Sequence, residues 1–262
     1  MVNVGVLASG RGSNFQAIVQ HQQLAVFQNV DVRILIYNHP EAPVRQVAEK
    51  YHVANELVEH RDRDRVEFER HIMSILDSFG IELICLAGWD RIVGSEFFRK
   101  YRWQVMNIHP ALLPSFGWKG LNARYVHEAA LEYGVKVTGC TVYFVDVSVE
   151  KGPIILQHPV RILESESSMF RWNREGAIQS LSNRVLVHEH RLYSKAIQLY
   201  ADKRLNVEEL VSGGEDARTN RVVSVSPRDN WTKIWNDRQR VFIEAQNAEL
   251  AAEGVQIDEE LD

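Results

Sequence analysis

The chain has few cysteines, no long apolar run and no excess of positive charge, and each shortage excludes a class of protein. Two cysteines in 262 residues cannot form a disulfide framework. No other Cys or His lies at a spacing typical of metal ligands, so a zinc site is not expected. No apolar stretch approaches the roughly 18 residues that cross a bilayer, and no signal-peptide pattern appears. A net charge of −5 provides no overall attraction for nucleic acid. We therefore expect a cytoplasmic protein without a membrane or nucleic-acid partner.

What is present is typical of a globular protein with a substantial core. Hydrophobic residues make up 45% of the chain and charged residues 25%, which is an ordinary balance for such proteins. Cys85 and Cys140 both lie in apolar runs, so we interpret them as buried thiols in a reducing compartment. The length fits either one α/β domain with a tail or two domains.

Short apolar runs alternate with helical patterns along most of the chain, which predicts a doubly wound, mostly parallel α/β sheet of the Rossmann-like type. The expected strands are 2–7, 31–37, 55–58, 81–87, 104–108, 138–145 and 154–162, and the expected helices are 14–21, 42–51, 62–79, 95–100, 123–133, 182–203 and 230–252. We expect a domain over 1–205, followed by a linker and helical C-terminal extension over 206–262.

The last expected helix is amphipathic, with an apolar face that must be covered. That face contains Trp231, Ile234, Trp235, Val241 and Phe242. It could pack on the protein's own domain or on a second subunit of a homodimer, and the sequence does not choose between them.

Asn107 and His109 are the most informative pair of residues. Because side chains alternate along a strand, both project from the same face. An amide can hold a carbonyl oxygen that gains negative charge, while an imidazole moves protons. The alternative is a strand end whose Asn and His only satisfy buried backbone groups.

A glycine-rich turn, GRGSN at 10–14, joins the first strand to the first helix. Glycine lets the backbone approach an anion closely, and the N–H groups at a helix N-terminus favour negative charge. Gly12, Ser13 and Asn14 could bind a phosphate, or could simply cap the helix.

The segment NIHPALLPSF at 107–116 resembles the signature of folate-dependent formyltransferases, most closely the branch that formylates glycinamide ribonucleotide. Five further segments match that branch in the same order: LASGRGSNFQ at 7–16, LAGWDRI at 86–92, GCTVYFV at 139–145, GPIILQ at 152–157 and EHRLY at 189–193. Each match alone is weak, but together they are highly specific.

The resemblance implies formyl transfer from 10-formyltetrahydrofolate, used as a co-substrate without a metal, to the amine of glycinamide ribonucleotide. Asn107 and His109 would be catalytic, together with Glu150, which would raise the pKa of His109. Gly12, Ser13 and Asn14 would bind the substrate's phosphate, and Glu189 its ribose. The folate would be bound by Leu86, Arg91, Ile92, Val93, Asp146, Val147 and Ser148.

Four departures from the family pattern keep other functions open. Glu150 replaces a family Asp, Asp90 replaces an apolar residue, the loop 115–122 is long, and 167–179 looks like an insertion. The protein could therefore formylate another amine, such as an amino sugar nucleotide, or be a catalytically silent homologue that binds folate or phosphate. Initiator-tRNA formylation is disfavoured by the acidic charge, and formyltetrahydrofolate hydrolysis by the expectation that no regulatory domain precedes the first strand.

Overall fold

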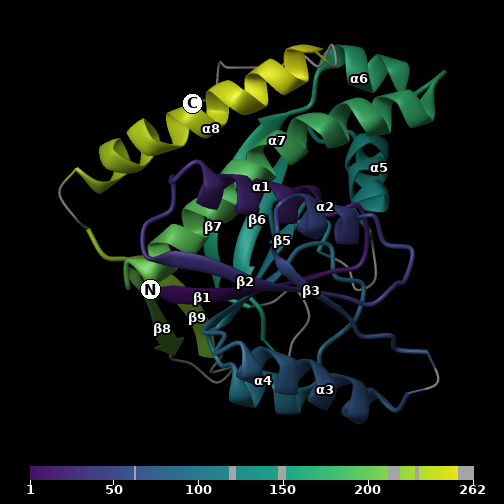
Figure 1. Ribbon diagram of the computed structural model, residues 1–262. Helices are drawn as coiled ribbons and strands as arrows, with labels where there is room; N and C mark the ends of the chain where they lie inside the picture. Colours follow the sequence, from purple (N-terminus) through teal and green to yellow (C-terminus); the bar gives the residue numbers. More distant parts are fainter. Residues whose placement is uncertain (62, 118–121, 147–151, 212–218, 228–229, 253–262) are drawn as a thin grey trace.

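The protein is built around one seven-stranded sheet (Figure 1), seen in a computed structural model that describes residues 1–61, 63–117, 122–146, 152–211, 219–227 and 230–252. The sheet has the strand order β3-β2-β1-β4-β5-β6-β7. Its strands are β1 (Val2–Ala8), β2 (Val30–Tyr37), β3 (Ala54–Leu57), β4 (Leu83–Leu86), β5 (Val105–His109), β6 (Val137–Phe144) and β7 (Ile154–Arg161). The first five strands run parallel, and β6 and β7 pair antiparallel beside them. This architecture confirms the predicted fold class.

Helices cover both faces of the sheet, as Figure 1 shows. The helices are α1 (Ser13–Gln23), α2 (Val44–Lys50), α3 (Arg65–Ser78), α4 (Ser95–Lys100), α5 (Ala123–Tyr133), α6 (Glu164–Met169), α7 (Arg174–Ala201) and α8 (Trp231–Ala252). One core cluster joins the sheet to α1, α2, α5 and α7, and a second joins it to α3 and α4. In the described part of the chain, no helix has the length and apolarity that crossing a bilayer requires.

Strand β1 shows why a central strand must be apolar on both faces. Val4 and Val6 belong to the first core cluster, whereas Leu7 belongs to the second. The glycine between the two valines, Gly5, has no room for a side chain, because a Cβ there would lie 2.9 Å from a methyl group of Leu76. Successive side chains of β1 point alternately toward the two layers of helices, and both layers bury them. This explains why the strand is a continuous apolar run.

Two details of the helices differ from the sequence prediction. α7 begins at Arg174 rather than near 182, and Asn173 caps it by accepting a hydrogen bond from the Gly176 N–H at 3.0 Å. The region 167–179 that looked like an insertion thus consists of the end of α6, a turn and the start of α7. The structure also contains α6, a helix that the sequence pattern did not predict.

A hairpin of β8 (Leu205–Val211) and β9 (Thr219–Val225) follows α7, and neither strand was predicted from the sequence. Leu205, Val207 and Val223 pack against the first core cluster. Residues 212–218, within the expected linker and extension over 206–262, lie outside the described residues. A domain boundary at 205 stays a prediction.

Helix α8 packs on the protein's own domain. Trp231, Trp235 and Phe242 are buried against the first core cluster, whereas Ile234 and Val241, expected on the same face, are exposed. Figure 1 shows α8 lying outside α1 and α7. The buried face of α8 therefore needs no second subunit to cover it.

Two buried histidines under α8 predict an acid-sensitive contact. On α1, the Nε2 of His21 lies 3.4 Å from the amide nitrogen of Gln239 on α8. On α7, the Nδ1 of His190 lies 3.1 Å from the amide nitrogen of Gln246 on α8. A neutral ring can accept such a hydrogen bond, but a protonated ring cannot. Burial lowers the pKa of His21 to about 4 and the pKa of His190 to about 3.

We expect the free energy of unfolding to fall as the pH decreases from about 6.5 toward 4. The unfolded chain binds protons at these histidines near pH 6.5, whereas the folded protein does not until lower pH, so acid favours unfolding. Urea titrations at pH 7.5 and 5 measure this difference. His190→Gln should flatten the pH dependence, while replacement of the exposed His52 should leave it unchanged. Equal pH dependence in the parent protein and the His190 variant would contradict the account.

Candidate active site

A cavity of about 430 Å³ opens at the carboxyl ends of β1, β4 and β5. The chain turns from β1 toward β2 on one side and later adds β4 on the other. Ligands of doubly wound proteins bind where strand order reverses in this way, because the loops diverge there. The cavity is lined by the turn 10–14, the segment 86–93 and the end of β5, together with residues of α5, β6 and α7.

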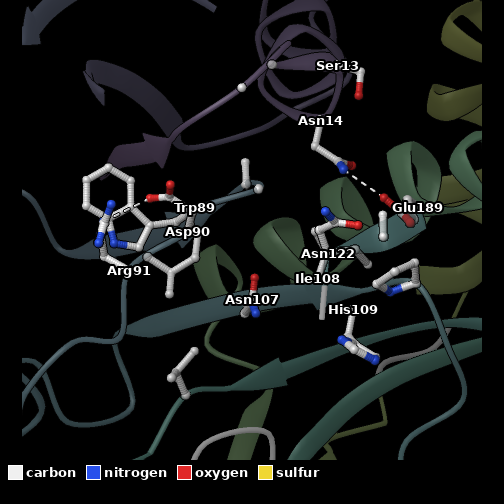
Figure 2. Close-up of a pocket in the computed structure, with 18 of the residues that line it drawn as sticks. Ser13, Asn14, Trp89, Asp90, Arg91, Asn107, Ile108, His109, Asn122 and Glu189 are labelled. Carbon is white, nitrogen blue, oxygen red and sulfur yellow. Dashed lines mark hydrogen bonds and ion pairs between the residues drawn. The ribbon is translucent and has the colours of Figure 1, made fainter. Parts of the chain in front are cut away.

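The glycine-rich turn at 10–14 forms one end of the cavity. Gly12 adopts a left-handed conformation with φ of 79° and stands directly before α1. Asn14 on α1 donates a hydrogen bond to Glu189 on α7 across 2.8 Å, as Figure 2 shows. Burial raises the pKa of Glu189. The first turn of α1 and the middle of α7 are thereby joined at this end of the cavity.

Gly12→Ala is expected to damage this end of the cavity. A Cβ at Gly12 would lie 2.3 Å from a methyl group of Val44, and alanine is strained at positive φ. We expect a loss of about 2 kcal/mol in unfolding free energy. Gly10→Ala is the matched control, because a Cβ at Gly10 meets no atom within 4 Å. Equal behaviour of the two variants in urea titration would show that the turn tolerates a side chain at Gly12.

Asn107 and His109 lie at the end of β5 and both line the cavity (Figure 2). The Asn107 amide nitrogen donates to the Tyr143 hydroxyl at 2.9 Å. Tyr143 lies on β6 opposite Asn107 in the antiparallel register, and its side chain is buried. A carboxamide held at one of its two N–H groups keeps a fixed orientation. Tyr143 therefore orients the donor that faces the cavity.

His109 is buried, and its Nε2 lies 3.1 Å from the carbonyl oxygen of Phe116. Burial lowers the pKa of His109, although the Phe116 carbonyl acts in the opposite direction. The family resemblance implies that Glu150 raises this pKa, but Glu150 lies outside the described residues. The described surroundings alone favour a neutral imidazole, which can accept a proton.

Asp90, one of the departures from the family pattern, joins three loops at the edge of the cavity. It accepts hydrogen bonds from Ser9 at 3.0 Å, from Asn38 at 2.7 Å and from His39 at 2.8 Å. Burial acts to raise the pKa of Asp90, but these hydrogen bonds and the neighbouring Arg91 outweigh it and hold the pKa below its usual value. The loops after β1, β2 and β4 are thus tied together by one carboxylate.

The structure brings the described site residues together in one cavity. They are Gly12, Ser13, Asn14, Leu86, Arg91, Ile92, Val93, Asn107, His109, Asp146 and Glu189. Val147, Ser148 and Glu150 lie outside the described residues. Cys85 and Cys140 are free and buried, as predicted. No cluster of three or more potential metal ligands occurs among the residues that the structure describes.

Tyr143 and His127 are among the cavity residues that were not predicted. Tyr143 lies within a segment that matched the family, but only the strand register places it opposite Asn107. His127 on α5 lines the cavity with its ring buried, and burial, with His109 nearby, lowers its pKa to about 4. A lone histidine in a helical pattern gives no sign of this position.

Residues 2–197 match the formyl transferase family, and the chain belongs to that family. The phosphoribosylglycinamide formyltransferase of Bacillus subtilis (strain 168) is 33% identical over 199 residues, which cover 76% of this chain and 94% of that protein. Glycinamide ribonucleotide transformylase 1 from Symbiobacterium toebii has a similar structure, with a TM-score of 0.73 and 32% identity over 87% of this chain and 95% of that one. These relatives confirm the resemblance found in the sequence.

A human relative, the trifunctional purine biosynthetic protein adenosine-3, is 38% identical over 207 residues. The match covers 79% of this chain but only 19% of the human protein. The chain therefore corresponds to about a fifth of that longer relative.

Proposed function

We propose that this protein transfers the formyl group of 10-formyltetrahydrofolate to the primary amine of glycinamide ribonucleotide, a step of purine biosynthesis. The observation that carries the proposal is the joint presence of Asn107, His109 and the turn at 10–14 in one cavity. The substrates named for the Bacillus and Symbiobacterium relatives are the further support.

In the proposed reaction, the amine nitrogen attacks the formyl carbon and a new N–C bond forms. The formyl oxygen becomes an oxyanion, to which the Asn107 amide donates. His109 accepts the proton that the amine loses. The bond from the formyl carbon to the folate nitrogen then breaks, and that nitrogen takes up a proton as the folate leaves. Glu150 is proposed to assist His109 in these proton movements.

The two substrates would enter from opposite ends of the cavity. We assign the phosphate of the ribonucleotide to Gly12, Ser13 and Asn14, because helix α1 begins there and presents backbone N–H groups. Glu189 would accept hydrogen bonds from the ribose hydroxyls.

The folate ring would lie against the segment 86–93, with its face on Leu86, Ile92 and Val93 and Arg91 at the rim. Asp146, Val147 and Ser148 are proposed to bind the folate as well. Leu86, Ile92 and Val93 all line the cavity, and Ile92 is 46% exposed. Together they provide an apolar surface that a flat ring can contact.

Turnover in three parallel reactions tests the proposal. The protein is mixed with 10-formyltetrahydrofolate and with glycinamide ribonucleotide, an amino sugar nucleotide or buffer, and the deformylated folate is followed by absorbance. We expect turnover only with glycinamide ribonucleotide. Turnover only with the amino sugar would identify a different acceptor. Folate binding without turnover in any reaction would indicate a catalytically silent homologue.

A further inference from the structure

Arg221 connects the C-terminal hairpin to the wall of the cavity. It lies on β9, beyond the segment 2–197 that matches the family. Its guanidinium donates to the carboxylate of Asp146 at 2.5 Å, and Asp146 lines the cavity. The side chain of Asp146 is 16% exposed and that of Arg221 is 36% exposed, so this ion pair is partly shielded from solvent.

The guanidinium of Arg221 is itself held in place by two further contacts. Its Nε donates to Glu209 on β8 at 3.2 Å, and its central carbon lies 5.7 Å from the centre of the Trp103 ring. Trp103 in turn packs edge-on against Phe144, at the end of β6. Two other segments, β8 and the turn before β5, therefore fix the position from which Arg221 contacts Asp146.

Asp146 stands at a fixed point of the backbone. The residue before it, Val145, donates from its N–H to the Val105 carbonyl at 2.8 Å, and Phe144 donates to the Pro153 carbonyl at 3.0 Å. Gly152 approaches Phe144 so closely that a Cβ would lie 1.7 Å from the Phe144 carbonyl oxygen. With its backbone anchored in this way, the direction of the Asp146 side chain depends on what binds its carboxylate.

We propose that Arg221 is a positioning residue for the formyl-donor side of the cavity, acting through Asp146. This inference rests on the proposed function, which assigns Asp146 to the folate. Arg221 fixes the Asp146 carboxylate and offsets its charge, so that the cavity wall is ready for the folate before it binds. The hairpin that follows the family domain thus tunes the affinity for the co-substrate.

Arg221→Met keeps the length of the side chain and removes the guanidinium. We expect the KM and the dissociation constant for 10-formyltetrahydrofolate to rise about five- to tenfold, the scale of a close coupled pair. The KM for the ribonucleotide and kcat should change less than about twofold, because a contact made equally in the bound and transition states affects only binding. Arg221→Lys should give a KM and a dissociation constant for the folate between those of the parent protein and Arg221→Met, since an ammonium lacks the planar fork of a guanidinium.

Arg102→Met is the matched control. Arg102 approaches the same Glu209 at 3.6 Å and the same Trp103 ring at 5.2 Å, but the structure records no contact between it and Asp146. The Arg102→Met variant should therefore bind 10-formyltetrahydrofolate as tightly as the parent protein does. Arg221→Met in the Asp146→Asn background should cause no loss beyond that of Asp146→Asn itself, because Arg221 acts on the cavity through the Asp146 carboxylate.

Isothermal titration with 10-formyltetrahydrofolate and steady-state kinetics decide the outcome. Weaker donor binding in Arg221→Met alone, with the ribonucleotide KM unchanged, supports the proposal. Equal binding in Arg221→Met, Arg102→Met and the parent overturns it, as do additive losses in the double variant or parallel increases of both KM values. If the parent protein itself binds no folate, the proposed function fails and this inference fails with it.

Discussion

Asn107→Ala is expected to lower kcat by about 100- to 1000-fold, the usual cost of removing one donor from an oxyanion site. Asn107 lines the cavity at the end of β5, with its amide oriented by the Tyr143 hydroxyl. The proposed contact strengthens only when the formyl oxygen becomes negatively charged. The KM values for both substrates should therefore change little. Single-turnover kinetics with saturating substrates measure the effect on the chemical step.

Tyr143→Phe distinguishes the contribution of the Asn107 amide from the contribution of the hydroxyl that orients it. This variant removes the hydroxyl that accepts the Asn107 hydrogen bond but keeps the amide and the buried ring. We expect a smaller loss, about tenfold, because the donor remains but is less well aligned. A loss below tenfold for Asn107→Ala, or a larger loss for Tyr143→Phe than for Asn107→Ala, would contradict the assigned role of Asn107.

Trp235→Ala is expected to have the largest effect on stability, with a loss of about 3–5 kcal/mol in unfolding free energy. The indole is 1% exposed and stacks with the rings of Trp231 and His21. Its N–H donates to Gln239 at 3.0 Å within α8. Removal of this side chain leaves a cavity beneath α8 and weakens its contact with α1. Urea titration followed by circular dichroism measures the loss.

Ile234→Ala is the control for Trp235→Ala on the same helix. Ile234 directly precedes Trp235 but is 41% exposed, so its truncation should cost less than about 1 kcal/mol. Similar losses in the two variants would mean that α8 does not pack through the face seen in the structure.

The fold was predictable because its signals are local. Each central strand is a short apolar run, and each such run joins a helical pattern through a turn. The Asn107 and His109 pair was predictable as well, because alternation along a strand fixes which side chains share a face.

The remaining features depend on contacts between segments far apart in the sequence. Tyr143 meets Asn107 only because β6 pairs with β5 in one particular register. The β8–β9 hairpin is rich in polar residues, and its burial comes from packing on the core through Leu205, Val207 and Val223. The pKa of His109 depends on its burial in the folded protein. Neither periodicity nor motif spacing encodes such tertiary contacts.

A crystal structure with glycinamide ribonucleotide and a non-reactive folate analogue tests the central claim most directly. The account predicts the folate ring against the segment 86–93, the phosphate at the turn 10–14, and the oxygen that mimics the formyl group about 3 Å from the Asn107 amide nitrogen. A folate bound outside the cavity, or one whose formyl position is remote from both Asn107 and His109, would contradict it.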